Sequence, residues 1–140
     1  MAGALSAARA LEAAGAFCPG RRPLGATELE GGHINRSWLV ELAGGRILVQ
    51  ALNTSVFADP EAVMGNVARA AAAARGLVPQ PLTTRDGRLL HRSGGALWRA
   101  LEYVEDTFCV EARPGPALAA EAGRALGRLH RALARLDPAE

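Results

Sequence analysis

The sequence predicts an α+β fold, a meander of about five antiparallel strands with one helix packed on a face. Three observations support it. Short segments with alternating apolar residues are joined by glycine turns, such as Gly44-Gly45. A helix start stands at Asp59-Pro60-Glu61, in the middle of the strand segments. Leucines at helical spacing over residues 118–136 then predict a long closing helix.

The first half of the chain begins with an alanine-rich helix, expected over residues 4–17. Strands are expected at 24–30, 34–42 and 46–53, with hairpins joining each to the next. The third strand presents alternate residues to two faces. One face has Ile47, Val49 and Ala51, and the other has Leu48, Gln50 and Leu52.

The helix that follows should begin with Asp59 as N-cap and Pro60 in the first turn, and end near Gly76. It crosses to the rest of the sheet, for which we expect short strands at 82–85 and 88–91 around the turn Asp86-Gly87. A further strand is expected at 96–104. The residues Pro114-Gly115-Pro116 separate it from the last helix.

Composition excludes several classes of function. The net charge is +2 and evenly spread, which gives no case for a nucleic-acid or membrane partner, and no apolar run reaches the ~20 residues of a membrane span. No basic segment precedes the apolar start, so we expect a cytoplasmic protein.

Cys18 and Cys109 fit free, buried thiols. All sixteen basic residues are Arg, which a GC-rich coding bias would explain. The chain contains no lysine, so lysine is excluded as a phosphate ligand.

The turn between the first two strands contains Gly31, Gly32, His33 and Asn35. Two glycines let a backbone approach an anion closely, and consecutive N–H groups can form an anion-binding concavity. A plain hairpin turn would use the same glycines, and His33 by itself fits a turn residue as well as an acid–base group.

A second group of candidates stands in or after the strands. Gln50 lies in the third strand, where a lone amide is usually exposed or locally hydrogen-bonded. Glu102, Tyr103 and Val104 precede a Pro/Gly break, and a strand end there leaves backbone groups free to meet a flat heterocycle. Any strand end has such groups, and Trp98 and Tyr103 also fit sheet packing.

In this order the motifs resemble the aminoglycoside phosphotransferase and choline kinase-like family, specifically its N-terminal lobe. The resemblance covers residues 24–136 and is strongest to the N-acetylhexosamine 1-kinase-like branch. The matching blocks are Gly32 to Val40, Leu48 to Asn53, Val56 to Pro60, Val63 to Val67, Thr83 to Gly87, and Trp98-Arg99 leading into Tyr103-Val104.

The resemblance implies a kinase-like N-lobe at 21–105, preceded by a helix at 1–20 and followed at 106–140 by a hinge and the first helix of a C-lobe. It also implies ATP as cofactor. The turn from Gly31 to Asn35 would cover the phosphates, Gln50 would occupy the usual lysine position, and Glu102 to Val104 would meet the adenine. Mg²⁺ is expected only with the missing C-lobe.

Two departures from the branch concern phosphate binding. Ala51 stands where the branch commonly has a basic residue, and Gly65 where it often has an acid. The residues that orient the acceptor and hold Mg²⁺ in this family belong to the C-lobe. None of Asp59, Asp86, Asp106 and Asp137 is placed to replace them, so we assign no catalytic and no metal-binding residue.

The sequence therefore predicts the nucleotide-binding lobe of a phosphotransferase for a sugar or other small hydroxyl compound, truncated before its catalytic residues and inactive alone. A separately encoded C-lobe is a possible partner. The alternative is a non-catalytic module for interaction or nucleotide sensing. A ligand-free α+β domain and a pseudogene remnant are also compatible with the residues.

Overall fold

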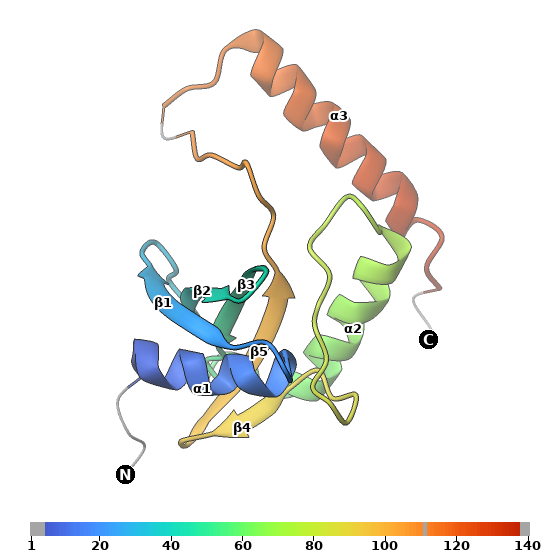
Figure 1. Ribbon diagram of the computed structural model, residues 1–140. Helices are drawn as coiled ribbons and strands as arrows, with labels where there is room; N and C mark the ends of the chain where they lie inside the picture. Colours follow the sequence, from blue (N-terminus) through green and yellow to red (C-terminus); the bar gives the residue numbers. More distant parts are fainter. Residues whose placement is uncertain (1–4, 111, 138–140) are drawn as a thin grey trace.

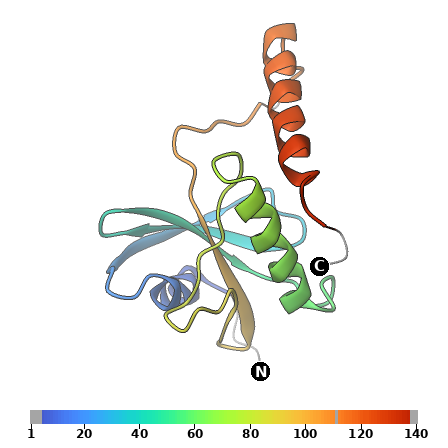
Figure 2. The ribbon, with the colours of Figure 1, turned by 90° about the vertical axis from the view of Figure 1, so that its right-hand side faces the viewer.

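The computed structural model describes residues 5–110 and 112–137. A five-stranded antiparallel sheet has the order β1-β2-β3-β5-β4, with α1 and α2 on opposite faces (Figures 1 and 2). The fold class predicted from the sequence is confirmed. The elements are α1 (Ala7–Phe17), β1 (Pro23–Leu29), β2 (Arg36–Leu42), β3 (Gly45–Ala51), α2 (Pro60–Ala73), β4 (His91–Ser93), β5 (Ala96–Glu102) and α3 (Pro116–Leu133).

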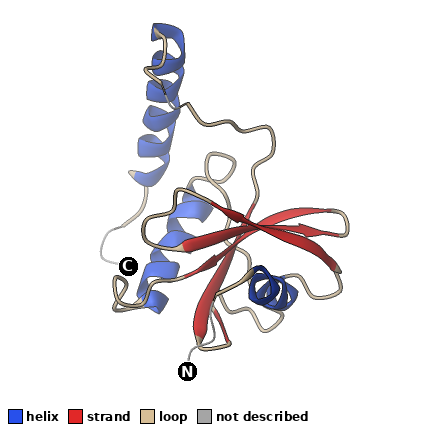
Figure 3. Cartoon of the chain, turned by 90° about the vertical axis from the view of Figure 1, so that its left-hand side faces the viewer, coloured by secondary structure: helices blue, strands red, loops and turns tan. Residues whose placement is uncertain are grey.

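The larger hydrophobic core lies between α1 and one face of the sheet. Figure 3 looks nearly along the axis of α1 and shows this helix beside the sheet. Trp38 of β2 and Trp98 of β5 are fully buried, with ring centroids 5.4 Å apart. Alanines at 10, 13 and 14 of α1 are also fully buried, and their small side chains let the helix approach the tryptophans closely. The strand residues of this face alternate with those of the other face.

A smaller core lies under α2, on the opposite face. Asp59 caps this helix by accepting a hydrogen bond from the Ala62 backbone N–H at 2.9 Å, and Pro60 occupies the first turn, as predicted. Met64 is fully buried against residues from three other segments, which are Leu52, Leu90 and Leu97. The rest of this sheet face is only partly covered by α2.

The last helix, α3, stands apart from the sheet at the end of a long extended segment (Figures 1 and 3). It has no buried residue, although its apolar stripe is strong in the sequence. Its contact with the lobe is the C-terminal end of α2, where Arg69 donates a hydrogen bond to the Asp137 carbonyl at 2.7 Å.

Three local predictions are wrong. Residues 82–85 do not form a strand, because Pro79 and Pro81 supply no N–H donors and pairing is limited to a bridge from Pro81 to Leu101. The following strand begins at His91 rather than at 88. Cys109 is exposed rather than buried, since it lies in the extended segment before α3, whereas Cys18 is buried as expected.

Candidate functional site

The sheet face that α2 only partly covers contains two rows of side chains that run across β2, β3 and β5. Strand register places Leu39 opposite Leu48 and Leu48 opposite Leu101, and we call these three half-buried residues the apolar row. Ser37, Gln50 and Arg99 form the polar row, which is offset from the apolar row by two residues on each strand, toward the glycine turn. Two residues of a strand span about 6.6 Å, so the rows lie side by side.

Hydrogen bonds connect the whole polar row. Gln50 Nε2 donates to Ser37 Oγ at 2.8 Å, and Arg99 Nε donates to Gln50 Oε1 at 2.8 Å. Arg99 also directs one Nη1 toward the sulfur of Met64 in α2, at 3.6 Å. Burial lowers the pKa of the Arg99 guanidinium. The row is therefore a pre-ordered set of donors with a partly desolvated positive charge at one end.

The glycine turn lies beyond the polar row, between the ends of β1 and β2. Gly31 has a φ of 93°, and a Cβ on Gly32 would lie 2.7 Å from the Asn35 carbonyl oxygen, so both positions require glycine. Asn35 Oδ1 accepts the Asn53 backbone N–H at 2.9 Å, which ties the turn to the end of β3. His33 is exposed. A compact turn of this kind leaves its outer backbone open to solvent.

The opposite end of the face is formed by the residues after β5. Arg46, at the start of β3, lies with its guanidinium 4.8 Å from the centre of the Tyr103 ring. The same guanidinium pairs with the Glu105 carboxylate through both of its oxygens, with Nε to Oε1 at 3.0 Å. Arg46 thus fixes the course of the chain on both sides of Val104.

The connection between α2 and β4 is hydrogen-bonded to Glu102, the last residue of β5. The Glu102 backbone N–H donates to the Gln80 carbonyl at 2.9 Å, and the Gln80 N–H donates to a Glu102 carboxylate oxygen at 3.2 Å. Gln80 Nε2 in turn donates to the Ala71 carbonyl of α2 at 3.0 Å. Glu102 is consequently turned toward this connection and away from the two rows.

We call residues 102–105, where the chain leaves β5, the hinge. A cleft of about 300 Å³ lies between the connection and the hinge, lined by residues 75–80 and 102–104. It contains Glu102, Tyr103 and Val104 but neither the glycine turn nor Gln50. Of the remaining predicted site residues, Gln50 lies in the polar row, and the glycine turn follows beyond that row. We therefore regard the sheet face as the candidate site, because its two rows lie between the residues after β5 and the glycine turn.

Sequence reasoning missed two residues of this arrangement. Arg99 belongs to a motif block, but nothing in the sequence indicates that it faces Gln50, which lies 49 positions earlier in a neighbouring strand. Arg46 was missed because its partners at 103 and 105 lie in another segment. The alternation of β5 about the buried Trp98 was the one available signal, because it places Arg99 on the opposite face.

Comparison with known proteins decides the family. Residues 25–140 match the model of the phosphotransferase enzyme family. The chain belongs to the phosphotransferase enzyme family. Among solved structures, it is similar to spectinomycin phosphotransferase APH(9)-Ia in complex with ADP and spectinomycin, with a TM-score of 0.65 and 11% identity. The match covers 91% of this chain and 38% of that one, so the chain spans well under half the length of that phosphotransferase.

This family membership agrees with the sheet and helices, which have the architecture of a kinase-like N-lobe. The N-acetylhexosamine kinase branch remains a matter of sequence motifs. Within residues 5–110 and 112–137, none of the helices has the length and apolar character needed to cross a bilayer.

Proposed function

We propose that this chain is the nucleotide-binding lobe of an ATP-dependent phosphotransferase that acts on a sugar or other small hydroxyl compound. The observation that carries the proposal is the order of residues along one face of the sheet: the segment after β5, then the apolar row, then the polar row, and then the glycine turn. The resemblance of its motifs to N-acetylhexosamine 1-kinases supports a sugar as acceptor.

The residues present fit an adenine nucleotide. Adenine is flat and apolar on its faces, and the half-buried leucines of the apolar row, beside the residues that follow β5, suit it. Phosphate oxygens need N–H donors and positive charge, which the polar row and the exposed turn offer two residues away. The orientation that follows has the base at the apolar row and Tyr103-Val104, and the phosphates toward Gln50 and the turn at Gly31 to Asn35.

The local partners of the described carboxylates support this proposal. Asp59 caps α2, and Asp86 accepts the Thr84 hydroxyl at 2.6 Å within a turn. Asp106 follows the hinge with a φ of 55°. In the described ranges, no three residues of the types His, Cys, Asp and Glu come together to hold a metal. We propose that the acceptor-orienting Asp and the Mg²⁺ ligands belong to a C-lobe, on this polypeptide or a separate one, and that the 140 residues alone transfer no phosphate.

Calorimetry with adenosine and ADP tests nucleotide binding directly. We expect both ligands to bind, and Leu48→Ala to weaken both by several-fold, because it removes apolar contact with the base. Leu24→Ala is the matched control, since Leu24 is a 54% exposed strand residue outside the rows. Absence of binding by the natural sequence, or an equal loss in both variants, would refute the proposed site.

A second candidate is a non-catalytic module that senses nucleotide or binds a protein. The exposed apolar side chains of α3, Leu118 at 40% and Leu126 at 52%, favour it. Mixing the chain with C-lobes of related sugar kinases separates the two. ATP-dependent sugar phosphorylation in a mixture supports the split enzyme, whereas nucleotide binding without turnover in any mixture supports the sensing module.

We further propose that the protein works in the cytoplasm, where ATP and a reducing environment are available. Its two cysteines, Cys18 and Cys109, are free thiols, and a disulfide between a buried and an exposed position is not formed.

A further inference from the structure

Arg99 is a positive charge with an unusual environment for this chain. Arg99 is half-buried, and its guanidinium extends from β5 to Gln50 Oε1 at 2.8 Å and to Met64 Sδ of α2 at 3.6 Å. Neither neighbour carries a charge. A guanidinium has five N–H donors, so these two contacts leave donors available.

The ion pairs found elsewhere in the described residues make the contrast plain. They join Arg36 to Glu28, Arg46 to Glu105, Arg88 to Asp86, and Arg124 to Glu121. All four are well exposed, where an ion pair contributes little. Burial lowers the pKa of the Arg99 guanidinium, and within the described ranges no ion pair joins Arg99 to a carboxylate. A buried charge without a counterion is costly unless something else supplies the anion.

Arg99 also determines how Gln50 is oriented. An arginine can only donate, so the amide oxygen of Gln50 must face it and the amide nitrogen must face Ser37. One N–H of that nitrogen is used by Ser37 Oγ. Among the described residues the second N–H makes no hydrogen bond, so it can donate to a ligand. The hydrogen bond from Arg99 polarises the amide and so strengthens that donor.

We propose that Arg99 is the phosphate-neutralising cation of this lobe, acting from β5 and through the Gln50 amide in place of a lysine on β3. The inference rests on the proposed nucleotide site and deepens it. The chain contains no lysine, so the positive charge of the phosphate subsite comes from an arginine. The register of β3 and β5 puts Arg99 directly opposite Gln50 in the polar row, which lies on the side of the apolar row away from the hinge.

The same geometry gives Arg99 a selective role. The base contacts the apolar row and the hinge, two or more residues away along the strands, so Arg99 has no part in binding adenosine. Only ligands with phosphate gain from it. The ratio of ADP affinity to adenosine affinity therefore measures the contribution of Arg99, separately from any effect on the fold.

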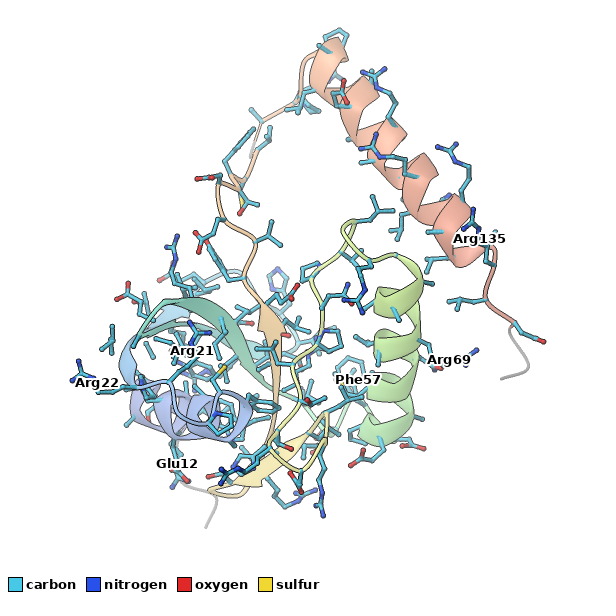
Figure 4. The ribbon with its side chains drawn as sticks, turned by 45° about the vertical axis from the view of Figure 1, so that its right-hand side comes forward. Glu12, Arg21, Arg22, Phe57, Arg69 and Arg135 are labelled. Carbon is cyan, nitrogen blue, oxygen red and sulfur yellow. The ribbon has the colours of Figure 1, made fainter. Side chains whose placement is uncertain are left out.

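The test is calorimetry of adenosine and ADP without Mg²⁺ at two salt concentrations, on the natural sequence and four variants. In Arg99→Met we expect ADP affinity to fall by roughly tenfold or more while adenosine affinity stays within about twofold. ADP binding should also lose much of its salt dependence. Arg22→Met is the matched control, because Arg22 is an exposed arginine that points outward, away from the sheet (Figure 4), and it should change neither affinity.

Two further variants keep the test decisive if Arg99→Met does not fold. Gln50→Glu places a carboxylate of the same shape opposite Arg99, so the charge is paired internally. It should fold at least as stably and bind ADP at least tenfold more weakly, again with adenosine affinity unchanged. Arg99→Lys retains charge without the bond to Gln50 and should give an intermediate ADP affinity.

The outcomes separate this inference from the proposed function. If the natural sequence binds neither ligand, both fail. If it binds adenosine and ADP but the ratio of the two affinities is the same in Gln50→Glu and Arg99→Met as in the natural sequence, the nucleotide site stands and the role of Arg99 is refuted. A parallel loss of both ligands in these variants would equally overturn it, because that pattern indicates a structural residue.

Discussion

Replacing Gly65 with alanine should stabilise the lobe. Gly65 lies in the middle of α2, which continues as a regular helix from Pro60 to Ala73. A Cβ built on Gly65 would meet no atom within 4 Å outside its own helix backbone, so alanine fits without rearrangement. The structure shows a complete helix in spite of the glycine, because Met64 anchors it to the small core.

The size of the effect follows from helix propensity and chain length. Glycine in a helix interior costs about 0.5–1 kcal/mol relative to alanine. For a lobe of this size, that corresponds to a rise in melting temperature of about 2–5 °C. Thermal unfolding followed by far-UV circular dichroism, with urea unfolding as a second measure, detects a shift of this size.

Two control variants make the prediction specific. Gly123→Ala, in α3, also has open space around its Cβ, but α3 contains no buried residue and should not affect the cooperative unfolding of the lobe. Gly76→Ala should lower the melting temperature, because Gly76 has a φ of 80°. Two results would contradict this prediction: a melting temperature of Gly65→Ala at or below that of the natural sequence, or an equal rise in the melting temperature of Gly123→Ala.

Three further predictions concern side chains. Cys109 should react with a maleimide quickly in the folded protein, and Cys18 only on unfolding or at higher pH. The reason is that burial raises the pKa of the Cys18 thiol and so reduces its thiolate fraction. Mass spectrometry of the labelled peptides measures both reactivities. Arg46→Met should weaken adenosine and ADP binding to a similar degree while leaving the circular dichroism spectrum unchanged, since the hinge loses its clamp; equal affinities in the variant and the natural sequence would contradict it. Thr84→Val should raise the pKa of Asp86, whose carboxylate the Thr84 hydroxyl holds below its ordinary range. In the natural sequence, the associated stability is present above that ordinary range and is lost as pH falls through the lowered pKa, which a carboxyl NMR titration of both proteins can follow.

The sheet and its helices could be predicted because their signals are local. Alternation defines β3 and β5, paired glycines define the β2–β3 hairpin, and the Asp59-Pro60 start defines α2. The region between α2 and β4 was predicted incorrectly for the opposite reason. There, two prolines and the hydrogen bonds of Thr84 to the backbone at Arg88 override a weak strand propensity.

The candidate site was predictable only in part. The glycine turn and the hinge each occupy one continuous segment, so their motifs could be found in the sequence. The pairing of Gln50 with Arg99 depends on strand register, and the clamp of Arg46 on the hinge depends on where the chain goes after β5. Such contacts come from the arrangement of the sheet and have no local signature.

Titration of the ¹⁵N-labelled chain with ADP, followed by backbone amide shifts, shows whether a nucleotide lies across the sheet face between the hinge and the glycine turn. We expect the shifts to cluster at residues 31–35, at 48–50 and at 103–104, and to leave α1 unchanged. Shifts confined to the cleft at 75–79 or to α1, or no shifts at millimolar ADP, would contradict it.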